Sequence, residues 1–125
     1  MKKNKQIDSL GEKLQKIIER SLLTPTLEEN LIRGTVVYID SFGNAITNIT
    51  KEFFEKERKT RAIEIDFPRK DVVVTRISNH YRDAARGQML VLFNSSGYME
   101  IAQNQGDAAG LYGLEYGDQI RIIFK

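Results

Sequence analysis

The feature that most constrains the fold is a succession of short segments rich in β-branched and aromatic residues, separated by polar turns. These segments are residues 35–39, 45–49, 62–67, 71–77, 88–93, 98–102 and 119–124. Short strands at such intervals are typical of a small antiparallel sandwich or barrel. The 125 residues suffice for one domain with one modest core. We therefore predict a mostly β fold, an antiparallel barrel or sandwich of about seven short strands.

Helical patterns occur at two places. Residues 7–23 have apolar side chains at spacings of three and four, and Thr24 and Pro25 follow, so an amphipathic helix is predicted there. Thr50 is suited to be the N-cap of a second, short helix that reaches about Arg58. The chain is accordingly divided into an N-terminal helix and linker, residues 1–33, and a β domain, residues 34–125.

The composition narrows the function classes. Charged residues make up 29% of the chain, the net charge is only +2, and the basic residues are scattered, so a nucleic-acid partner is not indicated. There is no cysteine and hence no disulfide framework. No apolar run approaches the roughly 20 residues of a membrane span, and the N-terminus lacks the apolar core of a signal peptide. A cytoplasmic location is expected.

The residues alone offer little catalytic chemistry. His80 is the only histidine, and a lone histidine in "SNHYRD" is more often a surface loop residue than a catalytic base. Without a Cys/His cluster no metal site is predicted, and the glycines of "GDAAGLYGLEYGD" do not form a phosphate-binding motif.

Two turns have residues suited to a ligand. In "DSFGN", Phe42 and Asn44 offer an aromatic face and an amide that can pair with the edge of a purine. In "NSSG", residues 94–97, hydroxyls and backbone N–H groups suit a carboxylate. The alternative is that both are ordinary hairpin turns, and the residues alone favour that interpretation because Gly, Asn, Asp and Ser are common in turns.

Three stretches together carry a resemblance to a known family. "RGTVVYIDSFGNAITNIT", "LFNSSGYMEIAQNQGDAAG" and "YGDQIRI" resemble, in order and spacing, the C-terminal domain of the S-adenosylmethionine hydroxide adenosyltransferases. This family includes the adenosyl fluorinases and chlorinases. The similarity extends from about Gly34 to Ile122, most of the chain.

The resemblance implies a function that is shared between two domains. In the family, an N-terminal α/β domain carries the Asp, Arg and His that activate water, and this domain has no counterpart here. The active site lies where that domain of one subunit faces the C-terminal domain of the next, usually within a trimer. Catalytic residues are therefore expected to be absent from this chain, and no metal or redox cofactor is implied. The chain would be a fragment, half of a split gene or a stand-alone relative.

The resemblance also assigns roles to four residues. Phe42 would line the purine, and Asn44 would hydrogen-bond its edge. Tyr81, in "HYRDAARG", falls where the family places an aromatic residue that stacks on adenine. Ser95 would bind the methionine carboxylate.

Three further positions complete the site that the resemblance implies. Ser96 stands where the halogenases have an arginine, and Gln103 likewise replaces an arginine near adenine. The backbone at Gln105 would meet the adenine amino group. The two replacements fit the water-using branch of the family better than the halogenases.

Two hypotheses of function follow. The first is the nucleoside-binding half of an S-adenosylmethionine hydrolase, in which water attacks the ribose C5′ and L-methionine leaves, producing adenosine. The second is a non-enzymatic β domain that binds adenosine or mediates oligomerisation. A neighbouring gene for the α/β half would favour the first.

Overall fold

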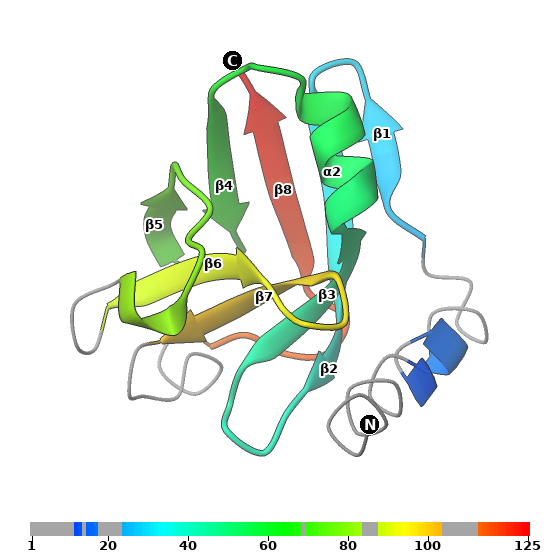
Figure 1. Cartoon of the computed structure of the whole chain (residues 1–125), viewed down its shortest axis with the longest axis vertical. Helices are drawn as coiled ribbons and strands as arrows, with labels where there is room; N and C mark the ends of the chain where they lie inside the picture. The colour runs from blue at the N-terminus through cyan, green and yellow to red at the C-terminus, as the bar shows by residue number, and fades with distance from the viewer. Residues whose placement is uncertain (1–11, 14, 18–23, 69, 84–87, 104–112) are drawn as a thin grey trace.

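The strands form one continuous antiparallel sheet in the computed structural model, which describes residues 12–13, 15–17, 24–68, 70–83, 88–103 and 113–125 (Figure 1). The strands are β1 (Thr26–Glu28), β2 (Leu31–Ile39), β3 (Ala45–Thr50), β4 (Ile63–Phe67), β5 (Lys70–Val74), β6 (Met89–Phe93), β7 (Tyr98–Gln103) and β8 (Gln119–Phe124). Helix α2 (Lys51–Arg58) and the single-turn 3-10 helix η1 (Tyr81–Asp83) accompany them. The predicted mostly β, antiparallel fold is confirmed.

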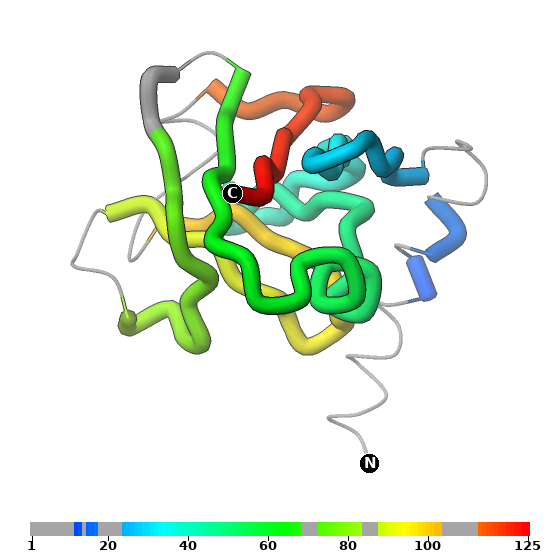
Figure 2. The backbone as a smooth tube through the Cα atoms, turned by 90° about the horizontal axis from the view of Figure 1, so that it is seen from above, coloured from blue at the N-terminus to red at the C-terminus, as the bar shows by residue number. Residues whose placement is uncertain are grey.

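The sheet curls into a nearly closed barrel. Its order is β5-β4-β8-β2-β3-β7-β6, and β1 pairs with β2 outside this path. The first half of β2 pairs with β8 and its second half with β3, with a register shift between Val36 and Tyr38, so β2 belongs to both halves of the sheet. After β5 the chain returns to the opposite edge, where the Ser78 N–H donates to the Val91 carbonyl at 2.7 Å. Figure 2 shows this segment beside β6.

Gly34 allows the close approach of β2 and β3. A Cβ at this position would lie 2.4 Å from Cδ1 of Ile49, which is fully buried. Beside it, the buried Asn48 accepts a hydrogen bond from the Thr35 N–H at 2.9 Å. Any side chain at residue 34 would therefore require the buried Ile49 side chain to move.

The hydrophobic core fills the barrel, and α2 covers one end of it. The Phe54 ring lies 5.4 Å from the Phe93 ring and 6.3 Å from the Phe124 ring, measured between centroids. Thr50 is the N-cap of α2, as predicted, and its hydroxyl accepts from the Phe53 N–H at 3.2 Å. This cap begins the helix directly where β3 ends.

The observed boundaries differ from the predicted ones at several places. β2 begins at Leu31 rather than at residue 35, and β1 occupies part of the predicted linker because the two strands pair. β5 ends at Val74 rather than at residue 77, where the chain leaves β4 to reach β6. Residues 12–13 and 15–17 are helical, and Ile17 packs against Val37 and Ile46. The rest of the predicted 7–23 helix lies outside the described residues.

No helix among the described residues is long and apolar enough to cross a membrane.

Candidate functional site

An open pocket of about 750 Å³ lies on the outer face of β3, β7 and β6. Its floor is built by register: Ile46 on β3 pairs with Glu100 on β7, which pairs with Leu92 on β6. Directly paired residues point to the same side of a sheet, so these three side chains form one row beneath the pocket. Two turns and η1 supply its walls.

The first turn, residues 40–44, joins β2 to β3 and is organised by Asp40. The Asp40 Oδ1 accepts from the backbone N–H groups of Phe42 and Asn44, both at 2.9 Å, and its Oδ2 accepts from Asn44 Nδ2 at 3.2 Å. Gly43 has a φ of 81°, a conformation that costs other residues strain. Phe42 is left 77% exposed at the tip of this turn.

The second turn, residues 94–98, joins β6 to β7 and is organised by Asn94. Its Oδ1 accepts from the N–H groups of Ser96 at 3.0 Å and Tyr98 at 3.1 Å. Its Nδ2 donates to Oε1 of Glu100 at 3.2 Å. Ser95 is exposed at the tip and lines the pocket.

Glu100 is the buried carboxylate of the site, with only 3% of its surface exposed. Its Oε2 accepts a hydrogen bond from the Tyr81 hydroxyl, while Oε1 accepts from Asn94. Burial raises the Glu100 pKa above its ordinary value; these two hydrogen bonds lower it again only in part, and the nearby Asp40 charge adds to the increase. Partial burial raises the pKa of the Tyr81 phenol, and the hydrogen bond to Glu100 raises it further.

The third wall is η1 with the residues before it. The Asp83 carboxylate accepts from the N–H groups of Asn79 at 2.8 Å and His80 at 3.1 Å, and these bonds lower its pKa. This arrangement holds Tyr81 against the sheet, with 45% of its surface still exposed. His80, expected as a surface loop residue, is indeed exposed, and it lines the pocket rim together with Arg82.

The structure brings four of the seven sequence-predicted residues to this pocket: Phe42, Asn44, Tyr81 and Ser95. Ser96 and Gln103 are not among its lining residues. The Ser96 hydroxyl is buried and has no hydrogen-bond partner in the described part of the chain. Gln103 pairs with Met89 at the far end of β7. Gln105 lies outside the described residues.

Sequence reasoning missed the residues that organise the pocket, Asp40, Asn94 and Glu100. It identifies both turns as candidate sites but assigns no role to the residue that begins each turn. A signal for Glu100 is present in "YMEIAQ", where one carboxylate stands between apolar residues. Such a residue is almost never buried unless it is paired.

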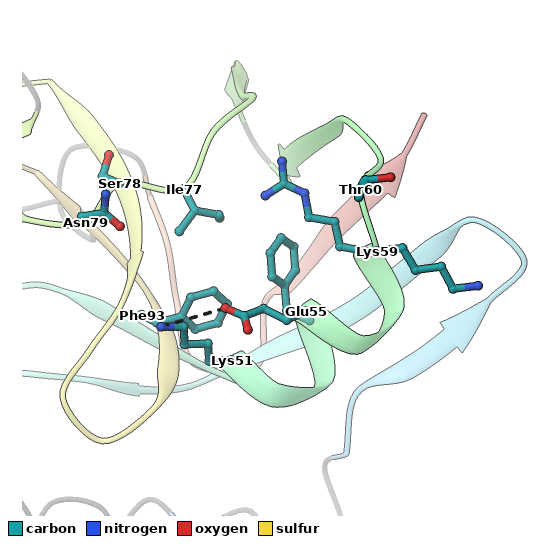
Figure 3. Close-up of a pocket in the computed structure, with 10 residues that line it drawn as sticks. Lys51, Glu55, Lys59, Thr60, Ile77, Ser78, Asn79 and Phe93 are labelled. Atoms are coloured by element: carbon teal, nitrogen blue, oxygen red, sulfur yellow. Dashed lines mark ion pairs between the residues drawn. The ribbon is translucent and has the colours of Figure 1, made fainter.

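A second pocket of about 570 Å³ lies between α2 and the segment 77–79 (Figure 3). Lys51 and Glu55 of α2 form an ion pair of 3.9 Å beside Phe93, and Lys59 points away from the pocket. None of the six sequence-predicted site residues that the structure describes lines it. Among the described residues, no group of three or more His, Asp or Glu side chains can hold a metal ion.

Comparisons with known proteins agree with this architecture. The family model of the SAM (S-adenosylmethionine) hydroxide adenosyltransferase C-terminal domain matches residues 34–121. A relative from Methanocaldococcus jannaschii, named (R)-S-adenosyl-L-methionine hydrolase, is 33% identical over 92 residues, which cover 71% of this chain and 35% of the relative. The chain thus aligns with about a third of that relative's length.

Two solved structures resemble the chain. An uncharacterized conserved protein from Thermotoga maritima matches with a TM-score of 0.69 and 31% identity, over 80% of this chain and 38% of that one. A conserved hypothetical protein from Thermus thermophilus matches with a TM-score of 0.58 and 24% identity, over 73% and 34% respectively. The second similarity concerns the fold alone.

Proposed function

Because the chain belongs to the family of SAM hydroxide adenosyltransferase C-terminal domains, we propose that its pocket binds the adenosine and methionine parts of S-adenosylmethionine. The observation that carries this proposal is the gathering of Phe42, Asn44, Tyr81 and Ser95 around one pocket. The name of the Methanocaldococcus jannaschii relative supports S-adenosylmethionine as the substrate and hydrolysis as the reaction.

Tyr81 and Phe42 are suited to hold a purine by its faces. The Tyr81 hydroxyl donates to Glu100, so the position of its ring is defined although much of the ring remains exposed. Stacking of a base on an aromatic side chain contributes roughly 1–3 kcal/mol in nucleic-acid complexes. Phe42 is the most exposed of the large apolar side chains described, as expected if it covers a ligand.

Asn44 is suited to read the purine edge through its carbonyl. Its Nδ2 donates to Asp40, which leaves Oδ1 as the atom that accepts from an exocyclic amino group. Adenine carries such a group at position 6, whereas hypoxanthine has a carbonyl there. This orientation favours adenosine over inosine.

Ser95 provides the other end of the site. It lies on the second turn, which borders the end of β3, because the Lys51 N–H donates to the Gly97 carbonyl at 2.9 Å. The first turn borders the start of β3, so the two turns are separated by the length of that strand. An elongated ligand with adenine at one end and a carboxylate at the other fits this separation.

The reaction needs a second domain. In the complete enzyme, the oxygen of water attacks the ribose C5′, the C5′–S bond breaks with its electron pair going to sulfur, and the water proton passes to a base on the α/β domain. Adenosine and L-methionine result. We expect that domain, from the same or a neighbouring gene, to join this one in a cytoplasmic trimer, and the chain alone to be inactive.

Calorimetric titration of adenosine into the chain, and into its complex with the α/β half, tests the proposal. Asn44→Ala should weaken adenosine binding by about 1–3 kcal/mol because it leaves a polar group of the purine unpaired. Tyr81→Ala should weaken it by a similar amount through loss of stacking. Asn30→Ala is the control, since Asn30 lies in an exposed loop where it accepts from Arg61.

Unchanged adenosine affinity in both pocket variants would contradict the proposal. Adenosine binding without any release of adenosine from S-adenosylmethionine by the complex would instead favour the non-enzymatic alternative. Turnover by the chain alone would contradict the assignment of catalysis to a second domain.

A further inference from the structure

The two loops that carry Tyr81 and Ser95 are joined through one buried side chain. Glu100 projects from the centre of β7, in the row formed with Ile46 and Leu92. One carboxylate oxygen accepts from the Tyr81 hydroxyl and the other from Asn94 Nδ2. Asn94 in turn accepts two backbone N–H groups of the turn that presents Ser95. A continuous chain of hydrogen bonds therefore runs from η1 to the second turn.

Burying the Glu100 carboxylate costs folding free energy, and its link between the two loops gives a reason for that cost. A carboxylate that is almost fully buried loses its hydration, and the apolar neighbours in this row do not replace it. An apolar residue at this position would continue the surrounding apolar cluster of Leu90, Leu92 and Ala102 on the same face. What an apolar residue cannot do is accept two hydrogen bonds from two different loops.

We propose that Glu100 is a positioning residue, which sets the Tyr81 ring and the Ser95 turn at the separation that an adenosyl ligand with a carboxylate requires. This inference rests on the proposed function for the ligand. It goes beyond that function because Glu100 itself is assigned no contact with the ligand. Each carboxylate oxygen controls one wall of the pocket, so a change at Glu100 affects both ends of the site.

The test compares two ligands that report on the two ends separately, adenosine for Tyr81 and L-methionine for Ser95. Tyr81→Phe keeps the ring but removes its hydrogen bond to Glu100. It should therefore weaken adenosine binding roughly two- to tenfold and leave the affinity for L-methionine unchanged. Glu100→Gln, whose side chain has the same shape, should weaken the binding of both adenosine and L-methionine by roughly two- to tenfold. Glu64→Gln is the matched control, because Glu64 is a carboxylate on β4 that pairs with Lys125 at 3.3 Å.

A double-variant cycle distinguishes positioning from general stability. If Tyr81 acts through Glu100, Tyr81→Phe combined with Glu100→Gln should weaken adenosine no further than the stronger single variant. If the losses of adenosine affinity in the two single variants multiply in the double variant, the inference is overturned. It is also overturned if the Glu100→Gln variant binds either ligand with an affinity within twofold of that of the unmodified chain. Melting curves of all variants show whether each remains folded.

Nuclear magnetic resonance separates this inference from the proposed function. Glu100→Gln should shift the side-chain amide signal of Asn94 and the ring signals of Tyr81, whether or not a ligand binds. If the unmodified chain binds neither ligand, the proposed function fails, and the role of Glu100 is decided by these signals. Unchanged Asn94 and Tyr81 signals in the Glu100→Gln variant would overturn the positioning role of Glu100.

Discussion

The two turns that border the pocket share one hydrogen-bond pattern but begin with different residues. In "DSFGN" the Asp40 N–H donates to the Asn44 carbonyl, and in "NSSGY" the Asn94 N–H donates to the Tyr98 carbonyl. In each, the side-chain Oδ1 of the first residue accepts from the N–H groups two and four positions later. In each, the fourth residue is a glycine with a positive φ, 81° in the first turn and 86° in the second.

The difference lies in the second polar atom of the first side chain. Asp40 has a second acceptor, and it accepts from Asn44 within the same turn. Asn94 has a donor instead, and it bonds to Glu100 on β7. One turn therefore closes on itself, while the other is attached to the sheet. The Asn94 nitrogen makes this attachment possible, because an ionised carboxylate in its place could not donate to Glu100.

The largest effect on stability is expected when Asn94, which begins the second turn, is replaced by aspartate, the residue type that begins the first turn. Asn94→Asp places a carboxylate against Glu100 in a buried setting, where one of the two charges lacks a partner. We expect a loss of about 2–4 kcal/mol in unfolding free energy at pH 7, which diminishes as acid protonates the pair. Denaturant unfolding at pH 7 and pH 4 measures this change. Asn30→Asp, beside Arg61, is the control and should cost little.

The glycines test whether the two turns are equivalent in backbone. Gly97→Ala has free space for its Cβ, so its cost is backbone strain alone, about 1–2 kcal/mol. Gly43→Ala should cost a similar amount, since Gly43 has nearly the same φ. Denaturant unfolding of both variants compares them. Costs that differ by more than about 1 kcal/mol would mean that the turns are not equivalent.

The reverse exchange in the first turn should have a smaller effect on stability but should change ligand preference. Asp40→Asn keeps Oδ1 as an acceptor, at a cost of about 1 kcal/mol because two charge-assisted hydrogen bonds become neutral. The new Nδ2 then faces Asn44, whose amide must rotate and present its own nitrogen to the pocket. We expect the ratio of adenosine to inosine affinity to fall. An unchanged ratio would contradict the assigned role of Asn44 Oδ1.

The smallest effect is a pH dependence of stability that arises from Glu100, the residue to which the second turn is attached. The pKa of Glu100 is raised in the folded state above its ordinary 4.5, so its contribution to stability is fully present below that value. The contribution is lost as the pH rises through the folded pKa. Unfolding curves should therefore show Glu100→Gln gaining stability relative to the unmodified chain as the pH rises through this window. A difference that does not vary with pH would contradict the raised pKa.

Local patterns predicted much of the fold. Alternation defined residues 62–67 and 119–124 closely, and Thr50 was identified as the cap of α2, because alternation and capping involve residues near one another in the chain. The start of β2 was missed. Its first residues pair with β1 and β8, and no local pattern at Leu31 reports those partners.

The sequence by itself determined seven of the strands, the places of the two turns and the family to which the chain belongs. Only the tertiary structure decided that Tyr81 and Glu100, 19 positions apart, share a hydrogen bond. It also decided that Ser95 faces the pocket while Gln103 lies at the far end of β7. The physical reason is that turn conformation follows from neighbouring residues, whereas strand order and register determine which distant side chains share a face.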